Sequence, residues 1–90
     1  MRVVIRTENG EHSLDFYMEY EPQKGDYICV ADLIEEEIEE MAGVVGDEKI
    51  LQHYEKCKAH YQKHDYWEVV RRVHNRWETI DIVIEVEPVP

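Results

Sequence analysis

Hydrophobic and polar residues alternate along two stretches of the chain, one near each end. In residues 12–20 the apolar side chains fall on every second position from Leu14 onward, and residues 79–87 repeat the pattern from Ile80 onward. Successive side chains of a β-strand point to opposite faces of a sheet, so a period of two is typical of a half-buried strand. Both stretches are therefore predicted to be strands.

Three further strands are predicted from shorter apolar runs. Residues 3–5 are β-branched, and the Asn9-Gly10 pair after them favours a hairpin turn because both residue types tolerate positive φ. Residues 27–30 and 66–73 are also rich in β-branched and aromatic side chains. In the second of these, two adjacent valines indicate a β-bulge. A turn at Asn75-Arg76 is expected to lead into the last strand.

Between these strands the apolar spacing changes from two residues to that of a helix. Asp32 followed by Glu35 has the spacing of a capping box, and Gly43 is a residue type that commonly ends a helix. A second helix is expected from Asp47 to about Lys63. Its predicted inner stripe consists of Ile50, Tyr54, Cys57 and Tyr61.

The predicted order is β-β-β-α-α-β-β, in a single α+β domain that spans residues 1–90. Strands on either side of a helical pair can join in one sheet that the helices cover. We therefore expect a five-stranded antiparallel sheet, or a small barrel, with a two-helix insertion. Trp67 and Tyr20 are expected in its core, since aromatic side chains fill the interior of small β proteins.

The step Pro22-x-x-Gly25-Asp26, together with the two strands predicted within residues 66–87, resembles small SH3-like β-barrel proteins of bacteria and phages whose function is unknown. The resemblance implies a barrel in which the helical pair is an insertion, and a bacterial, phage or mobile-element origin. It implies no activity and no binding residue, because this kind of fold supports many unrelated functions.

The chain is strongly acidic, with 21 Asp and Glu against 10 Lys and Arg and a net charge of −11. A field of this sign repels nucleic-acid phosphates and anionic membranes, so neither is expected as a partner. The sequence has no apolar run of the length of a membrane span and only two cysteines. We therefore expect a cytoplasmic protein that needs no cofactor.

One constellation has the residue types of a metal site. His53, Cys57, His60 and His64 recur at spacings of three and four, which places them on one side of the second predicted helix. Zinc prefers His and Cys ligands, so His53, Cys57 and His60 are a candidate metal site. The structural interpretation is favoured, because Cys57 also fits the apolar stripe and the histidines lie beside it.

A second set of residues has the chemistry of an interaction surface. Tyr17 lies on the polar side of its predicted strand and Trp77 lies near a predicted turn, while Glu36 and Glu40 belong to an acidic helix face. Exposed aromatic residues are common at interfaces. A partner protein, or a second copy of this chain, is therefore expected on these residues. An inhibitor that imitates nucleic acid through its acidic face is an alternative.

No enzyme template is matched, since the sequence contains no Gly-rich phosphate loop, no nucleophile elbow and no His-Glu-x-x-His. The chain is therefore expected not to be an enzyme. The preferred hypothesis is a non-enzymatic protein-interaction or structural module, and a metal-binding protein is the alternative from another class.

Overall fold

The computed structural model describes residues 1–42, 48–74 and 80–90. Its elements follow the predicted order β-β-β-α-α-β-β. They are β1 (Arg2–Thr7), β2 (Leu14–Tyr17), β3 (Tyr27–Ile28), α1 (Val30–Ala42), α2 (Glu48–Tyr61), β4 (Trp67–His74) and β5 (Ile82–Pro88). The predictions on Gly43, Asp47, Asn75, Arg76, Trp77 and residue 79 lie outside the described residues.

Two predicted strands are shorter than the alternating pattern suggested. β2 covers only Leu14–Tyr17 of residues 12–20, because His12 has a φ of 53°, which an extended strand does not adopt. β3 ends at Ile28, and α1 begins at Val30 rather than Asp32. Alternation in the first case and an apolar run in the second therefore located the strands correctly but overestimated their length.

The five strands form one mixed sheet in the order β2-β1-β5-β4-β3. Three neighbouring pairs are antiparallel, whereas β1 and β5 run parallel, with Val3 opposite Ile82 and Thr7 opposite Val86. The predicted all-antiparallel sheet is therefore wrong at its centre. The physical reason is that β5 enters between β1 and β4, where it is buried from Ile82 to Val86, and side-chain alternation carries no information on a neighbour's direction.

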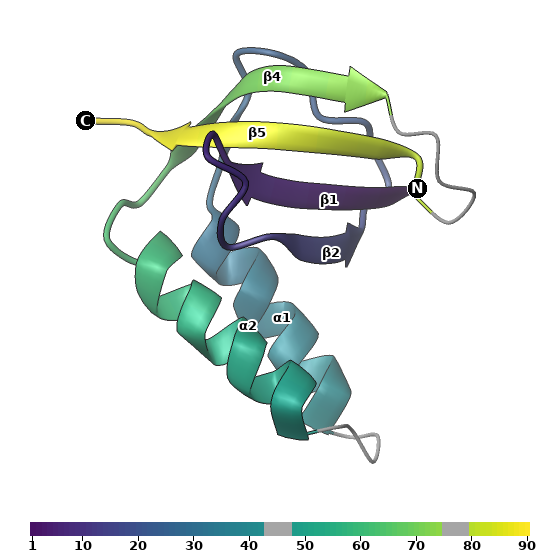
Figure 1. The fold of residues 1–90 in the computed structure, drawn as a ribbon, viewed down its shortest axis with the longest axis vertical. Coiled ribbons are helices and arrows are strands. Elements are labelled where there is room, and N and C mark those ends of the chain that lie inside the picture. The colour runs from purple at the N-terminus through teal and green to yellow at the C-terminus, as the bar shows by residue number, and fades with distance from the viewer. Residues whose placement is uncertain (43–47, 75–79) are drawn as a thin grey trace.

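The sheet curls, and the two helices lie side by side beneath it (Figure 1). Its edge strands β2 and β3 are not paired with each other among the described strands, so the sheet is an open half-barrel. The α+β class and the pair of helices between the third and fourth strands are confirmed. An ion pair joins the two helices, with Nζ of Lys58 on α2 lying 3.9 Å from Oε1 of Glu35 on α1.

The hydrophobic core lies between one face of the sheet and the helices. Ile34 of α1 and both Cys57 and Tyr61 of α2 are buried against the sheet. The sheet contributes Val3, Ile5, Leu14, Phe16, Ile28, Trp67, Val69, Ile82, Ile84 and Val86. Apolar burial of this kind is the main term that stabilises a small domain.

Two apolar residues depart from the predicted core. Trp67 is buried as expected, but Tyr20 is 59% exposed because β2 has already ended at Tyr17. Ile50, at the start of the predicted helical stripe, is 49% exposed, whereas Cys57 and Tyr61 further along α2 are buried. The first turn of α2 therefore extends beyond the part of the sheet that the helix covers.

The predicted β-bulge is confirmed in β4, where the register shifts between Val69 and Arg71. Val69 lies opposite Val86 and is buried in the core, while Arg71 lies opposite Glu85 on the other face of the sheet. Residues 69 and 71 would share a face in a regular strand. The extra residue between them places their side chains on opposite faces, which is the geometric effect of a bulge.

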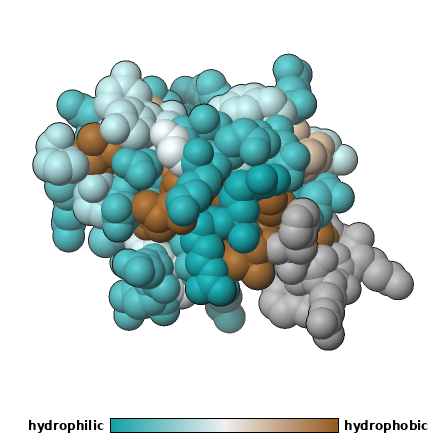
Figure 2. Space-filling view, turned by 90° about the horizontal axis from the view of Figure 1, so that it is seen from above, coloured by the Kyte–Doolittle hydropathy of each residue, from teal (hydrophilic) through white to brown (hydrophobic). Residues whose placement is uncertain are grey.

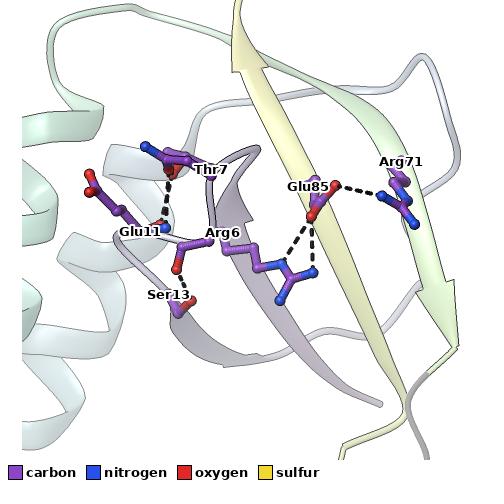
Figure 3. A network of polar contacts seen from close by, with 8 residues as sticks. Arg6, Thr7, Glu11, Ser13, Arg71 and Glu85 are labelled. Carbon is purple, nitrogen blue, oxygen red and sulfur yellow. Dashed lines mark hydrogen bonds and ion pairs between the residues drawn. The ribbon is translucent and has the colours of Figure 1, made fainter.

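The outer face of the sheet carries an ion-pair row across three strands (Figure 3). Glu85 on the central strand is only 4% exposed, and Arg6 of β1 donates to its Oε2 from Nη2 at 2.9 Å and from Nε at 3.2 Å. Arg71 of β4 lies 3.8 Å from the other carboxylate oxygen. The two arginines compensate the buried carboxylate, which would otherwise be costly.

Figure 2 shows the molecule from above, relative to the view in Figure 1. This face is mainly hydrophilic, and hydrophobic residues form small groups between polar ones. Among the described residues, neither helix has the length and apolar character needed to cross a membrane.

Candidate functional site

Helix α2 is attached to the edge strand β2 and to the residues just before it by side chains that donate to backbone carbonyls. The Tyr61 hydroxyl donates to the carbonyl of His12 at 2.9 Å, and the Tyr54 hydroxyl donates to that of Asp15 at 3.0 Å. His53 Nε2 lies 2.9 Å from the Ser13 carbonyl, which can only accept, so this nitrogen carries the proton. The turn after β1 is thereby held against the C-terminal half of α2.

A cleft of about 570 Å³ opens where this turn meets the end of α2 and the last residues of β5. The β1–β2 turn, the end of α2 with the residues after it, and β5 with the start of β4 each form one wall. The lining residues are Thr7, Glu8, Asn9, Glu11, His12, His60, Lys63, His64, Trp67, Val86, Glu87 and Pro88.

Aromatic rings form the inner part of this cleft. The imidazoles of His12 and His60 are stacked, with centroids 3.9 Å apart and planes inclined by 11°. Trp67 is buried behind them, its ring 5.4 Å from that of His60 and 5.5 Å from that of His64. The cleft therefore presents flat π-systems from three separate segments of the chain.

Tyr61 fixes the position of these rings. Its carbonyl accepts a hydrogen bond from Trp67 Nε1 at 3.0 Å, and its ring meets the indole edge to face at 4.9 Å. Burial, and to a lesser extent Cys57, raises the pKa of the Tyr61 phenol, so its hydroxyl stays protonated and donates to His12. One buried side chain thus links the turn, the helix and β4.

The electrostatics of the cleft are unbalanced. Glu8, Glu11 and Glu87 contribute three carboxylates and Lys63 contributes one ammonium group, and all four residues are exposed. Burial lowers the pKa of His60, and the nearby His12 and Lys63 lower it further. His60 is therefore neutral at pH 7 and adds no positive charge to compensate the rim.

The candidate metal ligands are only partly brought together. His53 Nε2 lies 3.8 Å from the sulfur of Cys57, but the ring of His60 stacks on His12. Burial raises the pKa of the Cys57 thiol, which disfavours the thiolate that a metal requires. Within residues 1–42, 48–74 and 80–90, no group of three His, Cys, Asp or Glu residues is arranged to hold a metal ion.

The predicted interaction residues lie away from the cleft. Tyr17 on β2 is 81% exposed, and Glu36 and Glu40 are exposed on α1. None of these three lines the cleft. Trp77 lies outside the described residues, so the predicted grouping of the two aromatic residues stays a prediction.

Sequence reasoning missed the residues that make the cleft. His12 and His60 are separated by 48 positions, and their rings meet where the hydrogen bond from Tyr61 holds the turn against α2. The one available signal was His12 itself, a bulky residue two positions after the Asn9-Gly10 turn. Helical spacing grouped His60 with His53 and Cys57, although its ring points to a different partner.

The arrangement can bind a small or extended ligand through stacking, rim charges and an apolar floor. Comparisons with protein-family models, with curated proteins and with solved structures gave no match. The chemistry of the cleft is accordingly derived from its own side chains.

Proposed function

We propose that this protein is a non-enzymatic binding module that holds a short peptide segment of a partner protein in the cleft beside His12 and His60. The cleft is the observation that carries the proposal. Its volume of about 570 Å³ falls within the range of roughly 300–1,000 Å³ that is usual for ligand sites. Its lining combines an apolar floor with polar groups at the rim, as such sites commonly do.

The side chains of the cleft favour binding over catalysis. Thr7 carries the one hydroxyl group among the described lining residues, and its Oγ1 lies 2.9 Å from the Glu11 carbonyl within the turn. The rings of His12 and His60 stack on each other, and neither makes a hydrogen bond to a hydroxyl or thiol nucleophile among the described residues. Among the described residues that line the cleft, a nucleophile–base pair, the usual basis of covalent catalysis, is therefore not formed.

The architecture also suits a binding role. The floor residue Trp67 is buried and held by the hydrogen bond to Tyr61, so a ligand meets a preorganised surface. Preorganisation lowers the entropy that binding must overcome. The rim residues Glu11, Lys63 and Glu87 are exposed, and their side chains are free to adjust to a partner.

A peptide-display selection tests this function. A library of random short peptides is selected on the wild-type protein, and the enriched peptides are measured on Glu11→Trp, which places an indole at the rim. The matched control is Glu39→Trp, the same substitution at an exposed position of α1. We expect the selected peptides to bind Glu11→Trp at least about tenfold more weakly than wild type, a loss of about 1.4 kcal/mol.

Binding to Glu39→Trp should remain at the wild-type level. The proposed function is wrong if no peptide is enriched, or if the enriched peptides bind both variants equally well.

A further inference from the structure

We infer that the segment bound in the cleft presents an arginine side chain, whose guanidinium group lies against the imidazole stack of His12 and His60 and pairs with the rim carboxylates. This inference rests on the proposed function and names the chemistry of its ligand.

The rim of the cleft carries more negative than positive charge. Three carboxylates face one ammonium group around the opening, in a chain of net charge −11. A cleft lined by one sign of charge concentrates ligands of the opposite sign and raises their rate of association. The field therefore selects a cationic ligand.

The carboxylates at the rim are available to a ligand. The outer-face carboxylate Glu85 is bound by Arg6 and Arg71, and Asp15 and Glu21 are also paired with arginines. In the described parts of the chain, no salt bridge engages Glu8, Glu11 or Glu87. The fold therefore pairs Asp15, Glu21 and Glu85 with arginines, whereas in the described residues it leaves the rim carboxylates without that partner.

The inner wall of the cleft favours arginine over lysine. The inner wall of the cleft is made of flat rings, with the planes of His12 and His60 nearly parallel. A guanidinium group is planar, weakly hydrated and able to stack on such rings, while its edge donates to carboxylates in a fork. An ammonium group is compact and strongly hydrated, and it would gain from the rim charges but not from the wall.

The charge of the cleft changes with pH. The titratable groups that face the bound cation are Glu8, Glu11 and His12 from the turn, His60, Lys63 and His64 from the end of α2, and Glu87 from β5. Protonation of His60, whose pKa is lowered by burial and by the nearby His12 and Lys63, adds positive charge to the wall as the pH falls. Binding of a cation should therefore weaken as the pH falls from 7 toward 5.

The experiment uses three capped pentapeptides with glycine on either side of a central residue. The central residue is arginine, lysine or citrulline, which has the shape of arginine without its charge. Each peptide is titrated into the wild-type protein of residues 1–90 at low salt and followed in ¹H–¹⁵N spectra. We expect the arginine peptide to bind about tenfold more tightly than the citrulline peptide and a few-fold more tightly than the lysine peptide.

Two variants test the contribution of the rim. Glu11→Gln combined with Glu87→Gln should weaken binding of the arginine peptide about fivefold, whereas Glu36→Gln combined with Glu39→Gln on α1 should change it less than about twofold. Equal binding of all three peptides, or equal effects of the two double variants, would overturn the inference. If display-selected peptides occupy the cleft without a basic residue, the proposed function holds and the arginine assignment fails.

Discussion

Tyr61 is the residue on which the geometry of the cleft depends most. It is fully buried, its hydroxyl donates to the carbonyl of His12, and its own carbonyl accepts from the indole of Trp67. A buried carbonyl that loses its donor costs about 1–3 kcal/mol, because water cannot replace the lost partner. The hydroxyl of this residue therefore stabilises the fold and fixes the position of His12.

We expect Tyr61→Phe to lower the free energy of unfolding by about 1–2 kcal/mol, measured by urea denaturation. The matched control is Tyr54→Phe, which removes a similar hydrogen bond to the Asp15 carbonyl from a residue that is only partly buried. The control should cost less, since the Tyr54 side chain is less buried than that of Tyr61 and water can replace its hydrogen bond more easily. A loss for Tyr61→Phe no larger than for Tyr54→Phe would contradict this role.

His60 carries a pH dependence whose sign follows from its surroundings. Its pKa in the folded protein is lowered from the ordinary 6.5, first by burial and then by His12 and Lys63. The unfolded chain therefore takes up a proton at this residue before the folded protein does. The contribution of neutral His60 to stability is present above about pH 6.5 and is lost as the pH falls through the lowered pKa.

We expect the wild-type protein to lose more stability than His60→Phe between about pH 7.5 and pH 5.5, as measured by denaturation midpoints. Phenylalanine keeps a flat ring beside His12 but cannot take up a proton. Burial and the neighbouring Glu40 and Glu36 raise the pKa of Glu37, which acts in the opposite direction near pH 4.5 and above, but both proteins share this group. Parallel pH profiles for the two proteins would contradict the role of His60.

At the scale of elements, the sequence predicts whether a segment is a helix or a strand better than it predicts which strands pair. Helical spacing located both helices, and the two adjacent valines of β4 marked a real bulge. The parallel pairing of β1 with β5 was not visible, because the side chains of a strand point to its two faces in turn whichever direction a neighbour runs. One signal was present: Ile82, Val83 and Ile84 are consecutive apolar residues, as in a strand buried on both faces.

Helix α2 illustrates why the candidate site was only partly predictable. Spacing correctly placed Cys57 and Tyr61 on one buried face and brought His53 close to Cys57. The direction of His60 depends on the turn after β1, which approaches from 48 residues away in the sequence. Periodicity within one helix describes neighbours on that helix, whereas contacts between elements depend on the tertiary fold.

At the scale of the whole molecule, the carboxylates have two different roles. Asp15, Glu21 and Glu85 are paired with arginines, and Glu85 is buried, whereas exposed glutamates lie on α1 and at the rim of the cleft. The resemblance to SH3-like barrels, self-association and imitation of nucleic acid all stay predictions. The cleft combines unpaired charge with an ordered aromatic wall, and this combination favours it over the face of α1 as the binding surface.

The central claim is that partners bind in the cleft and not on the surface that carries Tyr17 and the α1 glutamates. The most direct measurement is a ¹H–¹⁵N titration of the wild-type protein with a display-selected peptide. We expect saturable shifts of the Trp67 indole N–H and of the His12, His60 and Glu87 amides, with little change at Tyr17, Glu36 and Glu40. Shifts confined to the latter three residues, with the indole signal of Trp67 unchanged, would contradict the claim.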